Sequence, residues 1–185
     1  MQQASQDRPV VLRAPSSAVV FGLVAAVAVV FVGDAVVRGA WSLAAQAAGP
    51  AALAVWAAWL LLVRPSIRLE SDRAVVVNVG RVTEVPWSRV ADIRRRLQLV
   101  LDLEDGSRVE CWGSPFPTRA GVNRNATSAD VAAPDTALTV LRSAWLSGSH
   151  DTTLPVVRRA DALALGIGAA ALAATIFSIT AGSIP

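Results

Sequence analysis

Three long apolar stretches without charged residues constrain this chain more than any other feature. They cover residues 14–33, 39–63 and 162–185. Each is close to or longer than the roughly 20 apolar residues that an α-helix needs to cross the hydrocarbon core of a bilayer. Hydrophobic residues also make up 54% of the 185 residues. The sequence therefore predicts three transmembrane helices.

The first two stretches are joined only by the few residues from Asp34 to Gly39, so we expect a helical hairpin over residues 16–63. A cleaved signal peptide is the competing interpretation of the first stretch, because Arg8 and Arg13 precede it. However, the apolar run is long for a signal peptide, and no clean cleavage site follows it. An uncleaved helix is favoured.

Arginines flank the three predicted spans unevenly. The connection between spans one and two holds only Arg38, beside Asp34. Because basic residues are enriched at cytoplasmic flanks, we expect a multi-pass protein of the inner or plasma membrane. Its N-terminus and the segment between spans two and three should be cytoplasmic, and its C-terminus outside. The arginines on the predicted cytoplasmic side are Arg8, Arg13, Arg64, Arg68, Arg158 and Arg159.

Small residues in the third span, "GIGAAALAA", allow two interpretations. Gly166 and Gly168 would permit the close approach of another helix, whereas an Ala-rich composition produces such runs without any packing role. None of the three stretches carries Asp, Glu, Arg or His near its centre. Transporters and proton relays usually need such groups, so the sequence disfavours transport chemistry.

The segment between spans two and three is predicted to form short β-strands rather than a helix. Val75, Val77 and Val79 would share one face of one strand, and Pro86 marks the end or edge of another. Alternation of this kind is typical of half-buried strands. The three predicted strands are "SIRLE" at 66–70, "AVVVNV" at 74–79 and "GRVTEVPW" at 80–87.

The strongest strand signal is "LQLVLDL" at 97–103, where four leucines alternate with mostly polar residues. Asp105-Gly106 follows, and both residues tolerate the positive φ that a type I′ hairpin turn requires. Val109 and Cys111 then alternate with polar residues. We predict an antiparallel hairpin with Leu97, Leu99, Leu101 and Leu103 on one face.

The rest of the segment reads as a loop and one amphipathic helix. Residues 114–130 are rich in Pro, Gly, Ser and Asn, which is typical of a loop. Asp135 would cap a helix that Gly148 ends. Its apolar stripe comprises Leu138, Leu141, Ala144 and Trp145. The predicted organisation is a tail at 1–15, a transmembrane hairpin at 16–63, a cytoplasmic domain at 64–148, a linker at 149–160 and a third span at 161–185.

An ordered set of short motifs resembles the small bacterial PH-like domain of actinobacterial membrane proteins. The motifs are Arg64-Pro65 after the helical hairpin, Val85-Pro86-Trp87 and Asp105-Gly106. The resemblance covers roughly residues 60–115, with Val90 where isoleucine is commoner, and the helix only weakly. It implies a cytoplasmic PH-like antiparallel β barrel or sandwich closed by one C-terminal helix, with no catalytic residues. The third span departs from the simplest two-span members.

Arg94, Arg95 and Arg96 are the candidate contact residues for anionic lipid or for a partner. A basic cluster near a membrane gains about 1 kcal/mol per residue. The alternative is a solvated strand end with cross-strand ion pairs, because residues 65–159 hold thirteen Arg against eleven acidic residues. Nucleic-acid binding would need a larger positive excess.

Aromatic and catalytic candidates are few. Trp87 and Trp112 are interpreted either as core aromatics or as a stacking platform for a ligand. Trp41 is interpreted as a residue at the membrane–water interface, at the outer end of the helical hairpin. Cys111 is expected to be a buried apolar residue, since the single histidine, His150, lies in a polar linker. One His and one Cys cannot form a metal site alone, and we find no nucleotide-binding or nucleophile motif. We therefore expect that the protein is not an enzyme and binds no cofactor.

These patterns predict a non-catalytic integral membrane protein with three spans. Its cytoplasmic PH-like domain would recognise a protein partner or the membrane surface, as part of cell-envelope assembly. One alternative is a small accessory or regulatory subunit of a transporter or channel, and another is an anionic-lipid sensor that uses the three arginines. The expected partners are the lipid bilayer and another membrane or cytoplasmic protein, not nucleic acid.

Overall fold

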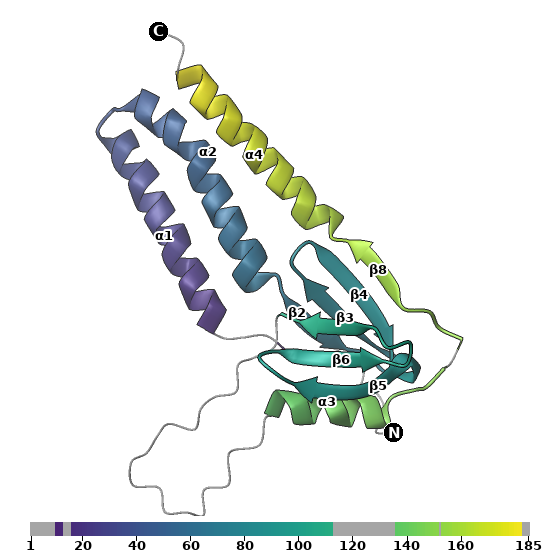
Figure 1. Cartoon of the computed structure of the whole chain (residues 1–185). Helices are drawn as coiled ribbons and strands as arrows, with labels where there is room; N and C mark the ends of the chain where they lie inside the picture. Colours follow the sequence, from purple (N-terminus) through teal and green to yellow (C-terminus); the bar gives the residue numbers. More distant parts are fainter. Residues whose placement is uncertain (1–9, 13–15, 113–135, 152, 183–185) are drawn as a thin grey trace, which may run out of the picture. The chain divides into compact units, whose positions relative to one another are not determined.

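The computed structural model describes residues 10–12, 16–112, 136–151 and 153–182. These residues divide into two compact units, each described here by itself. The helical unit holds the described residues of Pro15–Pro65, Val79–Arg81 and Arg159–Pro185. The β unit holds those of Met1–Ala14, Ser66–Asn78 and Val82–Arg158. Figure 1 labels the elements of both units.

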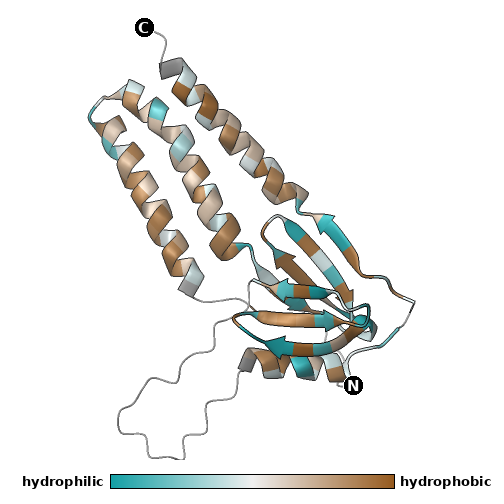
Figure 2. Cartoon of the chain, in the orientation of Figure 1, coloured by the Kyte–Doolittle hydropathy of each residue, from teal (hydrophilic) through white to brown (hydrophobic). Residues whose placement is uncertain are grey.

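Three apolar helices make up most of the helical unit. They are α1 (Ser16–Val37), α2 (Trp41–Ala58), which continues as the π-helical turn η1 (Trp59–Val63), and α4 (Ala162–Gly182). Figure 2 shows them coloured largely as hydrophobic. Each contains a stretch long and apolar enough to cross a membrane: Ser17–Val37, Trp41–Val63 and Ala162–Thr180. The three apolar helices are confirmed, and they indicate a multi-pass membrane protein.

Close packing between α2 and α4 depends on small residues. A Cβ added at Gly168 of α4 would collide with the ring of Trp56 of α2. The Nε1 of Trp56 donates a hydrogen bond to the carbonyl oxygen of Ala164 at 2.9 Å, which fixes the ring in this position. Gly166 has open space where its Cβ would lie. The helix-packing interpretation is therefore confirmed for Gly168, whereas no neighbouring residue of this chain lies where a Cβ at Gly166 would be.

Five strands form one antiparallel sheet in the order β1-β2-β3-β4-β8. Strands β2, β3 and β4 confirm the three predicted strands, and Ile67 pairs with Val76 across β2 and β3. Strands β1 and β8 lie in the segments that we treated as tail and linker. The strand bounds are β1 (Val10–Leu12), β2 (Ser66–Leu69), β3 (Arg73–Asn78), β4 (Arg81–Pro86) and β8 (Val157–Ala160).

A second sheet contains β5 (Val90–Arg95), β6 (Leu99–Leu103) and β7 (Arg108–Cys111), in that order. The β6–β7 hairpin is confirmed, with Leu101 opposite Val109. Leu97 is an exception to the predicted face, because the strand starts only at Leu99 and Leu97 lies in the preceding turn. Its side chain is 88% exposed.

The turn of the β6–β7 hairpin differs from the predicted type I′. Gly106 has a φ of +78°, but Asp105 has no positive φ, whereas type I′ requires positive φ at both central residues. The Gly106 N–H donates to the carbonyl of Leu103 at 3.0 Å, and the Leu103 N–H to that of Ser107 at 2.9 Å. This pattern is a type I turn followed by a glycine bulge, which is a common longer hairpin loop.

The core of the β unit lies between the sheets and α3 (Thr136–Ser147), which runs beside β5 (Figure 1). On β3, Ala74 and Val76 face this core, so the core does not use the face with Val75 and Val77. The predicted apolar stripe of α3 is confirmed: Leu141 is fully buried, and Leu138, Ala144 and Trp145 pack against the core. The predicted cap, Asp135, lies outside the described residues.

Trp87 forms hydrogen bonds with several elements of the β unit. It is fully buried, so its interpretation as a core residue is confirmed. Its Nε1 donates to the carbonyl of Glu70 at 3.0 Å, and its backbone N–H to that of Asp72 at 3.0 Å. The Nε1 of Trp145, on α3, donates to the carbonyl of Trp87 at 3.3 Å. These bonds join the β2–β3 turn, the end of β4 and α3.

Candidate functional site

The three candidate arginines lie where β5 ends and the turn to β6 begins. Arg94 and Arg96 are exposed, whereas Arg95 is half-buried, because successive side chains of a strand point to opposite faces. Burial lowers the pKa of the Arg95 guanidinium from its ordinary value, although an arginine stays charged at neutral pH. The structure thus does not gather the three side chains on one face.

Ion pairs across the strands surround Arg94. Asp92 and Asp102 are directly opposite each other on β5 and β6, an arrangement in which like charges repel. The Nε of Arg94 lies 3.0 Å from the Asp92 carboxylate and 2.8 Å from that of Asp102. The Nε of Arg108 is 3.0 Å from the other oxygen of Asp102. The interpretation as cross-strand ion pairs is confirmed for Arg94, and lipid or partner binding by Arg94–Arg96 stays a prediction.

Two large apolar side chains are exposed at the same end of this sheet. Leu99 pairs with Cys111, so Leu97 and Trp112 both lie just beyond the last pair of the ladder. Leu97 is 88% and Trp112 is 54% exposed. We call this surface the sheet-end patch and define it as Arg94, Arg96, Leu97 and Trp112.

Asn78 holds Trp112 in place at the sheet-end patch. The Nδ2 of Asn78, the last residue of β3, donates to the carbonyl of Glu110 at 2.7 Å. Its Oδ1 accepts a hydrogen bond from the backbone N–H of Trp112 at 3.0 Å. The amide thereby satisfies two backbone groups at the edge of β7 in place of a further strand. Trp112 can be identified as a candidate from the sequence, but no local pattern indicates its contact with Asn78.

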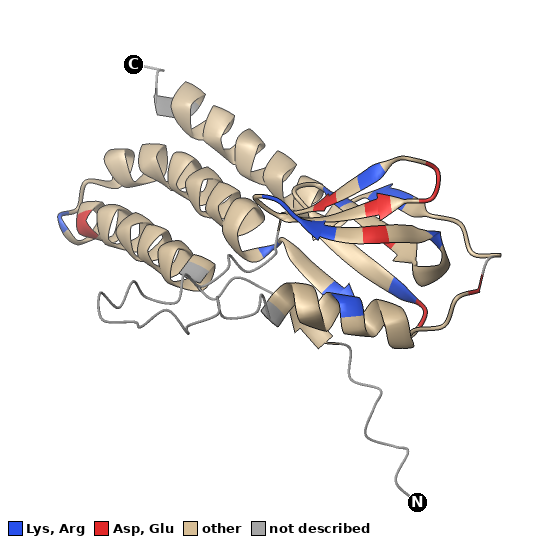
Figure 3. Cartoon of the chain, turned by 60° about the horizontal axis from the view of Figure 1, so that its bottom comes forward, with Lys and Arg blue, Asp and Glu red and all other residues tan. Residues whose placement is uncertain are grey.

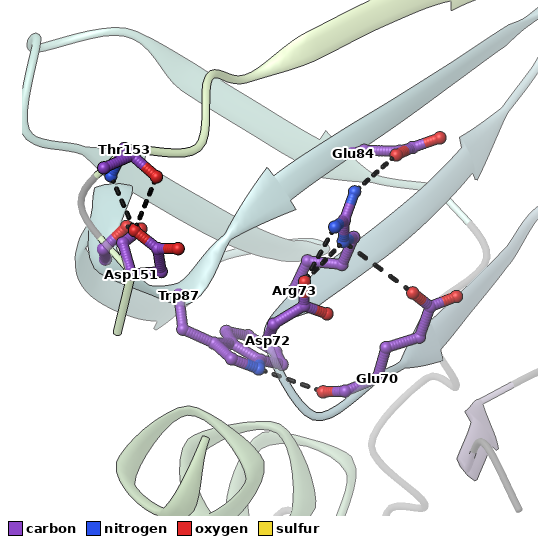
Figure 4. A network of polar contacts seen from close by, with 8 residues as sticks. Glu70, Asp72, Arg73, Glu84, Trp87, Asp151 and Thr153 are labelled. Carbon is purple, nitrogen blue, oxygen red and sulfur yellow. Dashed lines mark hydrogen bonds and ion pairs between the residues drawn. The ribbon is translucent and has the colours of Figure 1, made fainter. Parts of the chain in front are cut away.

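A second cluster of charges surrounds Arg73 at the β2–β3 turn (Figure 4). Its guanidinium donates to the Asp72 carboxylate at 2.7 Å and to the Glu84 carboxylate at 3.0 Å. The hydrogen bond from Arg73 lowers the pKa of Asp72. These contacts fix the turn against β4, and they supply a structural role for Arg73 that needs no ligand.

The helical unit has a polar site of its own at the junction of η1 and α4. The Nε and Nη2 of Arg64 lie 2.6 and 2.9 Å from the two carboxylate oxygens of Asp161. Asp161 also accepts a hydrogen bond from the backbone N–H of Ala164 at 3.3 Å, so it caps the first turn of α4. The Arg64 guanidinium lies over the ring of Trp59, 5.6 Å from its centroid. Hydrogen bonding by Arg64 lowers the pKa of Asp161.

An apolar groove of about 690 Å³ runs between the helices of the same unit. Phe21 and Val32 of α1, Ala52 and Trp59 of α2 and η1, and Ile167 of α4 are among its lining residues. Its lining also includes small residues, among them Ala28, Gly33 and Ala51. The sequence could not reveal this groove, because its shape depends on how the helices pack.

Groups for metal or nucleophilic chemistry are separated from each other. Among the residues that the structure describes, no cluster of His, Cys, Asp or Glu is arranged to hold a metal ion. Cys111 is fully buried, as predicted, and desolvation raises the pKa of its thiol to about 12. His150 is exposed, with its Nδ1 2.9 Å from the carbonyl of Gly148.

Comparisons with known proteins give no family for this chain. No protein-family model matches it, and neither a curated protein nor a solved structure is significantly similar to it. Fold analogy therefore adds nothing to the argument, and the function is inferred from the residues of the two units.

Proposed function

We propose that this chain is a non-catalytic membrane protein whose β unit is a cytoplasmic, PH-like module that recognises a protein partner in cell-envelope assembly. The observation that carries the proposal is the sheet-end patch. It exposes Leu97 and Trp112 beside Arg94 and Arg96. Tryptophan and arginine are enriched among the residues that dominate binding energy in protein interfaces.

The charge distribution favours a protein partner over a lipid surface for this patch. Within the patch, the Nε of Arg94 lies 2.8 Å from the Asp102 carboxylate, which the Nε of Arg108 also contacts at 3.0 Å. Compensated charges attract an anionic membrane weakly, because the long-range Coulomb terms cancel. A protein interface depends more on buried apolar and aromatic contacts at its centre, which Leu97 and Trp112 would supply.

The cytoplasmic orientation is supported by the arginines of the helical unit. The Arg64–Asp161 ion pair brings the end of η1 and the start of α4 together. The backbone hydrogen bond between Asp161 and Gly80 also brings the chain near Arg81 and Arg159 to this end. The α1–α2 connection, in contrast, holds a single arginine, Arg38. Arg38 is paired with Asp34 at 2.8 Å, and Figure 3 shows blue and red meeting at this connection. Basic residues mark the cytoplasmic flank of membrane spans.

Site-specific photo-cross-linking of the full-length protein in its native membrane tests the proposal. A cross-linking amino acid at position 97 is expected to give a discrete protein adduct. The matched control carries the same group at Glu104, which is exposed at the other end of β6 and should give none. In addition, Trp112→Ala should weaken the adduct at position 97. Lipid adducts alone, or equal adducts at both positions, would refute a protein-binding patch.

A second candidate, a small accessory or regulatory subunit of a transporter or channel, is favoured by the apolar groove of the helical unit. Such a groove can receive a helix of another membrane protein. Replacing the spans by a generic anchor separates the two functions: a recognition module keeps its cross-linked partner, whereas an accessory subunit loses it.

A third candidate, the anionic-lipid sensor, predicts a different result. Changing Arg94, Arg95 and Arg96 to Ser would then abolish binding to anionic vesicles while the fold stays intact. If the module binds a protein through Leu97 and Trp112, the same triple variant should leave binding to anionic vesicles unchanged.

A further inference from the structure

The apolar groove of the helical unit extends along much of α1 and α2. On α1 its lining reaches from Phe21 to Gly33, and on α2 and η1 it reaches from Ala48 to Trp59. At the ordinary helical rise, each of these stretches is about 17 Å long. One leaflet contributes half of the roughly 30 Å hydrocarbon core of a bilayer. The groove therefore matches in length the acyl layer of a single leaflet.

The wall of the groove offers apolar contacts along its length. Every lining residue is Ala, Gly, Val, Ile, Phe or Trp. The indole N–H of Trp56 is donated to the carbonyl of Ala164, so this polar atom of the lining is already satisfied. Val29 and Ala52 line the groove and are exposed, which shows that it opens to the surroundings of the helices. In a bilayer, lipid chains can enter it from the side.

The volume of the groove fits one acyl chain better than a helix. It is about 690 Å³. A chain of about 17 carbons needs roughly 500 Å³ if each carbon takes about the 30 Å³ of one liquid water. A helix about 10 Å wide and 17 Å long needs roughly 1,300 Å³, so only part of its cross-section would enter. A single chain would fill the groove.

A polar group lies at one end of the groove. Trp59 belongs to the lining, and the guanidinium of Arg64 lies over its ring, 5.6 Å from the centroid. The Nε and Nη2 of Arg64 donate to Asp161, which compensates the positive charge. A guanidinium has five N–H donors, so this pair does not use the hydrogens of Nη1. Trp59 also lies near the end of the apolar stretch Trp41–Val63, where the polar part of a bilayer begins.

We propose that the groove binds one acyl chain of a glycerophospholipid, whose ester oxygens accept hydrogen bonds from Arg64. The chain runs from Trp59 towards Gly33 and Ala48. Because Asp161 compensates the charge of Arg64, the site selects the lipid by its chain and its ester and not by the charge of its headgroup. A free fatty acid is disfavoured, since its carboxylate would be repelled by that of Asp161. The proposal rests on the proposed function only in that the helices span a membrane.

The test uses the full-length protein in digitonin, a detergent without an acyl chain, and phosphatidylcholine with a photoactivatable diazirine on one chain. A diazirine near the ester should form adducts at Phe21 and Trp59. A diazirine near the end of the chain should form them at Gly33 and Ala48, and mass spectrometry locates both. Unlabelled phosphatidylcholine and phosphatidylglycerol should displace the probes equally well, whereas palmitic acid should not.

Two matched pairs of variants separate the groove from the rest of the helical surface. Val29 and Val30 are 72% and 70% exposed, but only Val29 of the two lines the groove. Val29→Phe should therefore lose the adducts, and Val30→Phe should keep them. Likewise, Ala52→Phe should lose them and Ala54→Phe should keep them, because both alanines are exposed and only Ala52 belongs to the lining. An unfolding temperature close to that of the wild type shows that a variant is folded.

Several outcomes would overturn the acyl-chain site. Adducts spread evenly over the exposed faces of α1 and α4 would do so, as would equal adducts in folded Val29→Phe and Val30→Phe. Displacement by palmitic acid but not by phospholipid would show a site for free fatty acids instead. Labelling that appears only after a second membrane protein is removed would show that a helix fills the groove. Val29→Phe should keep the protein adduct at position 97, so failure of the acyl-chain site can be distinguished from failure of the proposed function.

Discussion

Arg64 and Asp161 are 97 residues apart in the sequence and form a two-point ion pair, with distances of 2.6 and 2.9 Å. Asp161 is almost fully buried, and Arg64 is mostly so. One residue follows the second apolar helix and the other precedes α4. The pair therefore holds together two helices that the chain connects only through the β unit.

Asp161→Asn should destabilise the helical unit by about 3 kcal/mol, because it leaves the Arg64 guanidinium without its counter-charge. The measurement is reversible unfolding in detergent micelles. The double variant Arg64→Gln/Asp161→Asn should be more stable than the sum of the two single changes predicts, by about 1–3 kcal/mol. Asp34→Asn is the control: its ion pair with Arg38 is exposed, so the change should cost less than about 1 kcal/mol. Additive effects at Arg64 and Asp161 would contradict the coupling.

Stability should fall at acidic pH partly through Asp161. Arg64 lowers the pKa of this carboxyl in the folded state, whereas in the unfolded chain it is about 3.9. The stabilisation is thus complete above about pH 4 and is lost as the pH falls through the folded pKa. Asp72, Asp105 and Asp151 also have lowered pKa values, so some acid sensitivity should persist in Asp161→Asn. Stability measured from pH 7 to pH 3 should fall less steeply in this variant, and identical slopes would exclude Asp161 as a contributor.

Gly166 and Gly168 of α4 should respond differently to substitution by alanine. Gly168→Ala places a methyl group against the ring of Trp56, whose Nε1 is held by the carbonyl of Ala164. Overpacking of this kind costs about 1–3 kcal/mol. Gly166→Ala meets open space and should be neutral or slightly stabilising, since alanine favours the helix. The two unfolding temperatures in detergent decide this point, and equal temperatures would contradict the packing of Gly168 against Trp56.

Cys111 should be inert in the folded protein. Burial raises its thiol pKa to about 12, and the thiolate is the reactive form. Iodoacetamide at pH 8 should therefore modify the wild type only after unfolding. A Cys111→Ala variant that carries Leu97→Cys should react quickly while folded, because position 97 is exposed. Rapid modification of the native wild type would show that the β unit opens or packs differently.

The sequence allowed the three apolar helices and the β6–β7 hairpin to be predicted, because both depend on local patterns. Span length follows from composition, and the alternation of Leu99, Leu101 and Leu103 indicates a strand by itself. The same reasoning placed Leu97 on the buried face, because periodicity does not show where a turn begins. The β3 core face was missed for a similar reason: Ala74 and Val76 alternate just as regularly as Val75 and Val77.

Features that depend on distant contacts could not be predicted. Strands β1 and β8 have three and four residues, too few to show a period, and exist only through pairing with other strands. Arg64 was identified as a basic flank, but nothing local connects it with Asp161. Likewise, nothing local in the sequence indicates that Gly80 accepts a hydrogen bond from the N–H of Asp161, just before α4. For the candidate site, Arg94–Arg96 and Trp112 were identified one by one, whereas their arrangement with Leu97 required the strand register.

Measuring on which side of the membrane the β unit lies tests the proposed function most directly. Single cysteines at Ala40, in the α1–α2 connection, and at Glu104, on the β unit, would be introduced into a Cys111→Ala background. Intact spheroplasts would then be treated with a membrane-impermeant maleimide, with detergent-opened cells showing that both thiols can react. We expect labelling at position 40 in intact cells and at position 104 only after opening. Labelling at position 104 in intact cells, with position 40 protected, would contradict it.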